Sequence, residues 1–114
     1  MTQALIVLHA AADAPDNRAL TALRLAGALM ADNKDVALFL VEAGAKLADP
    51  ALDAANPCHS LFYELLEVGM QVYVCGATMR KLGWEQEHLP ADVQRSSMKA
   101  LSGLMTAAEE IISF

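Results

Sequence analysis

The chain has 114 residues, of which 55% are apolar and 19% are charged, and its formal net charge is −6. This length suits a single domain, residues 1–114, that needs neither disulfides nor metal to fold. The eight Lys and Arg residues are scattered and aromatic residues are few, which argues against nucleic acid as a partner. No apolar stretch approaches the roughly 20 residues of a membrane helix, so we expect no membrane partner.

The first residues, MTQALIVLHAAAD, lack the basic region of a signal peptide, and their apolar run has the length of a strand. We therefore expect a cytoplasmic protein, in a compartment where cysteines stay reduced. The two cysteines, Cys58 and Cys75, are too few for a disulfide framework, so both are treated as thiols.

In the first third of the chain, two strands of the buried type flank a helix. ALIVLH (Ala4 to His9) and DVALFLV (Asp35 to Val41) are apolar runs without alternation, as in strands that are covered on both faces. Between them, apolar residues at helical spacing predict a helix from Asp16 to about Met30, with Asn33 as a C-cap.

The middle of the chain continues this alternation. A loop from about Gly44 to Asn56 has a length that is often functional or mobile. Asn56 followed by Pro57 predicts the start of a second helix, which ends at Gly69. MQVYVC (Met70 to Cys75) then predicts a third strand, followed by a short helix.

The last third adds a short strand, DVQR (Asp92 to Arg95), a helix capped by Ser96 or Ser97, and a closing strand, EIISF (Glu110 to Phe114). Strands and helices therefore alternate along the whole chain. This alternation predicts an α/β domain with three α/β/α layers and a mostly parallel sheet of about five strands.

Residues at the carboxyl ends of the strands are the candidates for chemistry, because sites of open parallel sheets lie there. The predicted strands end near His9, Glu42 and Cys75. We expect the strand that ends at His9 to lie beside the third strand. Its imidazole would then serve Cys75 as a cation or a proton acceptor.

Cys75 has the most suggestive surroundings of the three. Gly76 permits a tight turn, and a helix that includes Thr78 follows directly. The free N–H groups of a helix start favour a thiolate, which is the nucleophilic form of cysteine. Arg80 and Lys81 add positive charge one turn further on.

Each candidate also has a purely structural interpretation. Cys75 could be a small apolar residue that fills a strand end, and His9 could be satisfied by a loop carbonyl. Cys58, beside His59 in the second helix, is a candidate second thiol, although we favour a partly buried helix residue. The paired spacing of zinc ligands is absent, so we expect no metal, and no phosphate loop or other motif predicts a cofactor.

Three segments resemble the DsrE/DsrF-like family, which includes the TusD and YchN relatives. The first and the last are ALIVLHAAADAPDNRALTALRLAGALMADNKDVALFLVEAGAKL and SSMKALSGLMTAAEEIISF. The most specific is VGMQVYVCGATMRKLGW, where the family places a cysteine at the end of a strand before a short helix. The likeness spans nearly the whole chain.

The resemblance implies a flavodoxin-like sheet and assembly into homotrimers or hexamers. It also implies a sulfurtransferase-like role, in which the strand-end cysteine carries sulfur as a persulfide in a relay. That role would fall on Cys75, whereas Cys58 matches no family residue. The likeness predicts the fold directly, whereas it suggests the reaction only by analogy with the family.

Three functions remain open on this basis. In the first, Cys75 accepts sulfane sulfur from a donor protein and passes it to an acceptor protein. In the second, the chain is a non-catalytic oligomeric module that binds a small ligand or a partner at the strand ends. In the third, Cys58 and Cys75 form a thiol redox sensor. We expect a homo-oligomer in each case, because Leu25 and Leu29 lie off the main apolar stripe of the first helix.

Overall fold

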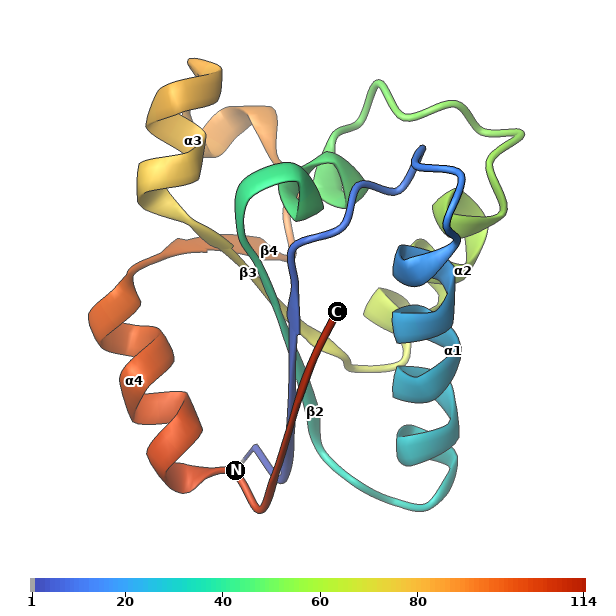
Figure 1. The fold of residues 1–114 in the computed structure, drawn as a ribbon, viewed down its shortest axis with the longest axis vertical. Helices are drawn as coiled ribbons and strands as arrows, with labels where there is room; N and C mark the ends of the chain where they lie inside the picture. Colours follow the sequence, from blue (N-terminus) through green and yellow to red (C-terminus); the bar gives the residue numbers. More distant parts are fainter. Residues whose placement is uncertain (1) are drawn as a thin grey trace.

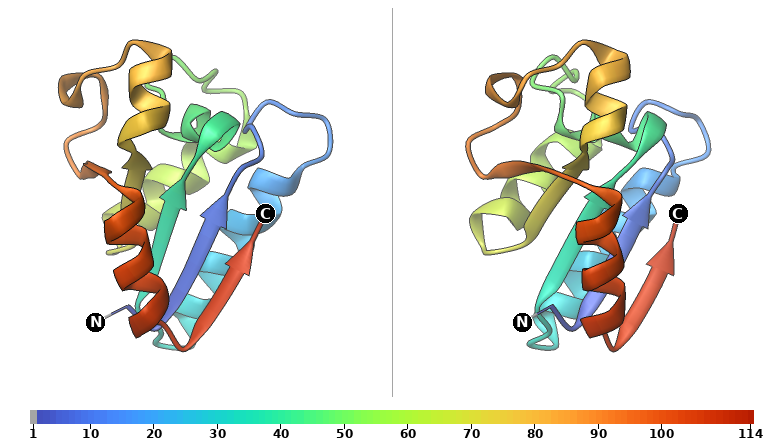
Figure 2. Two further views of the ribbon diagram at one scale, coloured as in Figure 1. Left: turned by 60° about the vertical axis from the view of Figure 1, so that its left-hand side comes forward. Right: turned by 90° about the vertical axis from the view of Figure 1, so that its left-hand side faces the viewer.

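The computed structural model describes residues 2–114 and contains one five-stranded sheet in which every strand pair is parallel. The strand order is β4-β3-β2-β1-β5 (Figures 1 and 2). The strands are β1 (Ala4–Leu8), β2 (Val36–Leu40), β3 (Gln71–Cys75), β4 (Val93–Ser96) and β5 (Glu110–Ser113). Every residue of β1 and β2 is buried, as their uninterrupted apolar runs predict.

Helices cover both faces of the sheet. The helices α1 (Arg18–Ala31) and α2 (Pro57–Glu67) lie on one face, and α4 (Met98–Ala107) lies on the other (Figure 1). The short helix α3 (Gly76–Leu82) continues upward from the carboxyl end of β3. The result is a three-layer, flavodoxin-like α/β/α domain, which confirms the predicted fold class. Within residues 2–114, no helix has both the length and the apolar character needed to span a bilayer.

The sheet separates two hydrophobic cores of unequal size. The larger core lies beneath α1 and α2 and includes Ile6, Leu38 and Phe62. The smaller core lies beneath α4 and includes Phe39 and Leu101. Because alternate residues of a strand point to opposite faces, neighbouring positions in β3 belong to different cores.

Local signals set most helix boundaries. Asn56 caps α2 by accepting the Cys58 N–H at 2.9 Å, with Pro57 as the first helical residue. After α1, Asn33 adopts the left-handed conformation that was expected of a C-cap, with φ at 63°. The helix α1 begins two residues later than predicted, at Arg18, because Asp16 instead accepts the Arg18 N–H at 3.2 Å.

The predicted loop from Gly44 to Asn56 is partly helical. Residues Glu42–Ala48 form a 3-10 helix, η1, and only the segment 49–56 remains irregular before α2. The helix η1 sits directly on the end of β1, since a Cβ at Gly44 would overlap the Leu8 carbonyl oxygen and lie 2.8 Å from its carbon. A second 3-10 turn, η2, covers Gln86–His88.

This close approach gives a testable prediction for Gly44→Ala. The added methyl group meets backbone atoms, which move less readily than a side chain, so η1 must shift away from β1. We expect the free energy of unfolding to fall by about 3 kcal/mol or more. Gly103→Ala in α4 is the matched control, because no atom lies within 4 Å of its Cβ position. That variant should gain roughly 0.5–1 kcal/mol from helix propensity. Equal urea midpoints for the two variants would contradict the prediction.

Candidate site at the carboxyl edge of the sheet

Cys75 ends β3 and is the residue immediately before α3. Its side chain is 5% exposed and belongs to the smaller core with Val41, Phe39 and Leu101. Gly76 is fixed against β4, because a Cβ there would lie 2.9 Å from Arg95 Nε and 3.1 Å from the Ser96 carbonyl oxygen. The glycine after Cys75 is therefore required by close packing against the neighbouring strand.

Two helices begin next to Cys75. The helix α3 starts at the following residue, as the sequence predicts. On the neighbouring strand β4, Ser96 pairs with Cys75. The helix α4 starts two residues after Ser96, and its cap Ser97 accepts the Ala100 N–H through Oγ at 3.1 Å. Helix N-termini carry partial positive charge, so two such ends meet at this edge of the sheet. The contribution of α4 was not predicted, because it depends on β4 lying beside β3.

The strand order corrects the expectation for His9. Strand β1 pairs with β2 and β5, so β2 lies between β1 and β3. Strands two positions apart are separated by about 10 Å, which is too far for a hydrogen bond between their end residues. His9 follows β1 and is exposed. It therefore lies at the same edge of the sheet as Cys75 but not beside it.

The cations near this edge also differ from those expected. Arg80 lies in the last turn of α3, exposed and at the helix end opposite Cys75. Lys81 reaches Glu42 instead, with Nζ 3.7 Å from Oε2. The cation that packs beside the Cys75–Gly76 peptide is Arg95 of β4. Sequence reasoning missed Arg95 because its position depends on strand pairing.

Thr78 is buried and connects two elements of this edge. It is 4% exposed, and its Oγ1 accepts the backbone N–H of Glu42 at 3.0 Å. Glu42 has φ at 52°, a left-handed conformation that is uncommon for a residue with a side chain. The hydroxyl therefore joins α3 to the end of β2.

Cys58 lies on the other side of the sheet. It is 2% exposed, belongs to the larger core, and has Sγ 4.0 Å from the Ala12 carbonyl oxygen. Burial raises the pKa of its thiol. The neighbouring His59 ring packs against Tyr63, with ring centroids 5.0 Å apart. The sheet thus stands between Cys58 and Cys75, an arrangement that does not favour direct pairing of the two thiols. Within residues 2–114, no group of three or more His, Cys, Asp or Glu residues could hold a metal ion.

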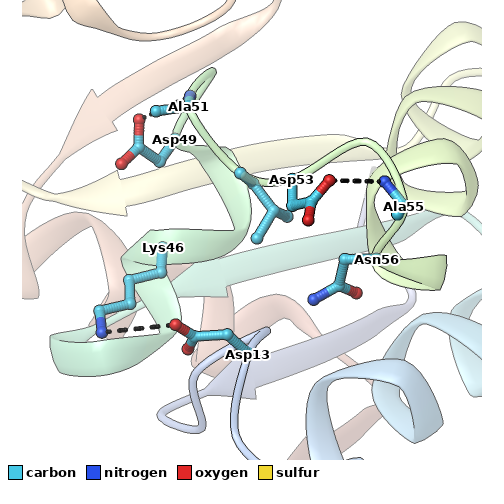
Figure 3. Close-up of a pocket in the computed structure, with 8 residues that line it drawn as sticks. Asp13, Lys46, Asp49, Ala51, Asp53, Ala55 and Asn56 are labelled. Atoms are coloured by element: carbon cyan, nitrogen blue, oxygen red, sulfur yellow. Dashed lines mark hydrogen bonds and ion pairs between the residues drawn. The ribbon is translucent and has the colours of Figure 1, made fainter.

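A cavity of about 550 Å³ opens beside η1 and is not lined by Cys75. Figure 3 shows its polar lining, in which Lys46 Nζ lies 3.9 Å from Asp13 Oδ2. Asp49 and Asp53 accept the backbone N–H groups of Ala51 and Ala55 in the same loop. The sequence marked this loop by its length alone, without indicating a cavity.

Comparisons with known proteins agree with this architecture. A model of the DsrE/DsrF-like family matches residues 3–114. The fold is similar to that of the YchN protein from E. coli, with a TM-score of 0.84 and 22% identity over 100% of both chains. No curated protein matches the sequence.

Two further solved structures are proteins of unknown function. MTH1491 from Methanobacterium thermoautotrophicum has a TM-score of 0.71 and 18% identity over 96% of this chain and 99% of that one. BT1422 from Bacteroides thetaiotaomicron has a TM-score of 0.69 and 17% identity over 98% of this chain and 95% of that one. Likenesses at such low identity establish the fold alone.

The burial of Cys58 predicts slow reaction with thiol reagents. In a Cys75→Ser variant, folded Cys58 should be alkylated by iodoacetamide about tenfold or more slowly than in the same variant unfolded in urea, because the buried thiol resists ionisation. Mass spectrometry over time measures both rates. Equal rates in the two states would refute the buried position.

Proposed function

Because the chain belongs to the DsrE/DsrF-like family, we propose that it is a sulfur-carrying protein in which Cys75 accepts and passes on sulfane sulfur. The observation that supports this most is the place of Cys75 at a strand end, beside the first turns of α3 and α4. Helix starts carry partial positive charge. A thiolate is the nucleophilic form of cysteine and the species that sulfur transfer needs.

The transfer step balances without an external oxidant. The Cys75 thiolate attacks the terminal sulfur of a donor persulfide, R–S–SH. A new S–S bond forms to Cys75, the donor S–S bond breaks, and the donor leaves as the thiolate R–S⁻. The proton stays on the transferred sulfur, which the Cys75 persulfide then hands to an acceptor thiolate by the same exchange. A reducing cytoplasm, where donor and acceptor proteins keep free thiols, suits this chemistry.

The supporting residues have unequal roles in this proposal. Gly76 lets the chain pass against β4, and Thr78 holds α3 to the end of β2. His9 is exposed at the same edge, but β2 lies between its strand and that of Cys75, so it takes no direct part in this proposal. Arg80 lies at the end of α3 opposite Cys75, and Arg95 pairs with Val74, so its side chain packs against Gly76 on the other face of the sheet from Cys75.

We further propose a homo-oligomer, a trimer or hexamer, that assembles through α4 and β5. Leu25 and Leu29, which first suggested an interface, instead pack against the larger core. Exposed large apolar side chains are found on α4, at Met98 and Met105, and on β5, at Ile111. Such side chains, clustered on one part of a surface, are typical of interfaces.

The cavity favours one alternative function. Its volume of about 550 Å³ is that of a small-ligand pocket, and it opens at the carboxyl edge of the sheet beside η1. A non-catalytic module would bind a small molecule there and would leave Cys75 unmodified. Sulfur uptake at Cys75 therefore separates the two functions.

The main prediction concerns persulfide formation. After treatment with glutathione persulfide, the wild-type chain should gain about 32 mass units, the mass of one added sulfur atom, on the peptide that contains Cys75. Cys75→Ser should gain nothing, and Cys58→Ser should load as the wild type does. If Cys58→Ser loses loading as completely as Cys75→Ser, a two-cysteine redox function replaces the carrier. If the wild type gains no sulfur, the binding module is the better function.

The oligomer is tested by light scattering at micromolar concentration. The wild type should have three or six times the mass of one chain, and Met105→Glu with Ile111→Glu should shift it toward the monomer, because charge is costly at an apolar interface. Val68→Glu is the control, since Val68 is 69% exposed in the turn between α2 and β3. A monomeric wild type would end this proposal.

A further inference from the structure

Within residues 2–114, Thr78 is the one polar residue that is buried, and its hydrogen bond is unusual. Its Oγ1 accepts from the backbone N–H of Glu42, thirty-six positions away in the sequence, at 3.0 Å. A buried hydroxyl needs a hydrogen-bond partner. Here the partner is Glu42, which follows Val41 just after the end of β2. The bond therefore connects two crossover connections of the sheet.

Glu42 has a backbone conformation that is uncommon for a residue with a side chain. With φ at 52°, it lies in the left-handed region, where the Cβ atom crowds the backbone. Such residues persist when their surroundings fix them, and they concentrate at functional sites. Two groups of α3 hold Glu42 here: the Thr78 hydroxyl on its N–H, and Lys81 Nζ at 3.7 Å from its carboxylate. The ion pair is exposed and contributes little, so the buried hydroxyl is the main constraint.

The opposite side of η1 is also blocked. Gly44 packs against the Leu8 carbonyl so closely that not even a methyl group fits. Gly44, two residues after Glu42, is therefore seated against β1, and α3 is joined to the same segment by its bond to Glu42. On its other side, α3 begins at Gly76, which packs against Ser96 and Arg95 of β4. Figures 1 and 2 show η1 and α3 at the same edge of the sheet, beyond the carboxyl ends of the strands.

We propose that Thr78 is the positioning residue of Cys75: by holding the strained Glu42 N–H, it fixes α3 and hence the Cys75–Gly76 peptide between β2 and β4. This inference rests on the proposed sulfur transfer. The attacking sulfur must lie in line with the donor S–S bond, because the new bond forms as the donor thiolate leaves on the opposite side. A shift of α3 would disturb this alignment while leaving the thiol itself intact.

The test compares Thr78→Val, which has nearly the same shape but cannot accept a hydrogen bond, with Thr78→Ser, which can. Two rates are measured at Cys75 by peptide mass spectrometry: sulfur loading from glutathione persulfide, and alkylation by iodoacetamide. For Thr78→Val we expect loading about tenfold slower, because alignment is lost, and alkylation severalfold faster, because a looser edge exposes the sulfur. Thr78→Ser should stay within about twofold of the wild type in both rates.

Leu23→Ala, in the core beneath α1, controls for lost stability. General destabilisation exposes Cys75 to both reagents alike, so this variant should not slow loading while it speeds alkylation. If Thr78→Val matches the wild type in both rates, or changes both in the same direction as Leu23→Ala does, Thr78 is only structural and the inference is wrong.

The same data separate this inference from the proposed function. A wild type that takes up no sulfur refutes the carrier function. In that case, alkylation that is faster in Thr78→Val than in Leu23→Ala, with rescue by Thr78→Ser, still supports a positioning role for the hydroxyl. Unchanged alkylation refutes that role as well.

Discussion

The burial of β1 and β2 on both faces is the constraint on which the rest of the structure depends. Strands with no polar side chain must be covered by helices on either side, and parallel strands joined by helices satisfy that need. All carboxyl ends of the strands then meet at one edge, and each connection begins there. The grouping of Cys75, η1, α3 and the start of α4 is therefore a consequence of the apolar composition of two five-residue strands.

The sheet also separates the two thiols of the molecule. Cys75 faces the smaller core under α4, whereas Cys58 lies in the larger core near the Ala12 carbonyl. Burial keeps the Cys58 thiol protonated, which suits an apolar filler, and the sheet stands between it and the strand-end thiol. A single-cysteine carrier fits this separation better than a two-cysteine redox sensor. The cavity beside η1 is likewise a feature of the edge that does not involve Cys75.

The sequence predicted most of what depends on local patterns. Apolar runs located β1, β2 and β3, and Asn33, Asn56 and Pro57 marked helix ends, because caps and turns are set by neighbouring residues. Strand order is set by pairing between distant segments, and so the place of His9 and the roles of Arg95 and α4 could not be predicted. The left-handed conformation of Glu42 could not be predicted either, and its N–H is bonded to a hydroxyl thirty-six residues away. Sequence patterns identified Cys75, but only the fold defines its neighbours.

A sulfur carrier of the proposed kind needs a sulfur that is held in place and that partners can still reach. The surroundings of Cys75 differ on its two sides in a way that bears on both needs. Toward α3 and β4, Gly76 and the Thr78 hydroxyl hold the backbone closely. Cys75, 5% exposed, packs with Leu101 of α4, which is the one buried residue of that helix, whereas α1 has four buried residues. Within one chain, local opening costs least where the least apolar surface is buried, and that is at α4. In the proposed transfer, the rigid side would set the direction of attack, whereas access from the α4 side would depend on how copies of the chain assemble.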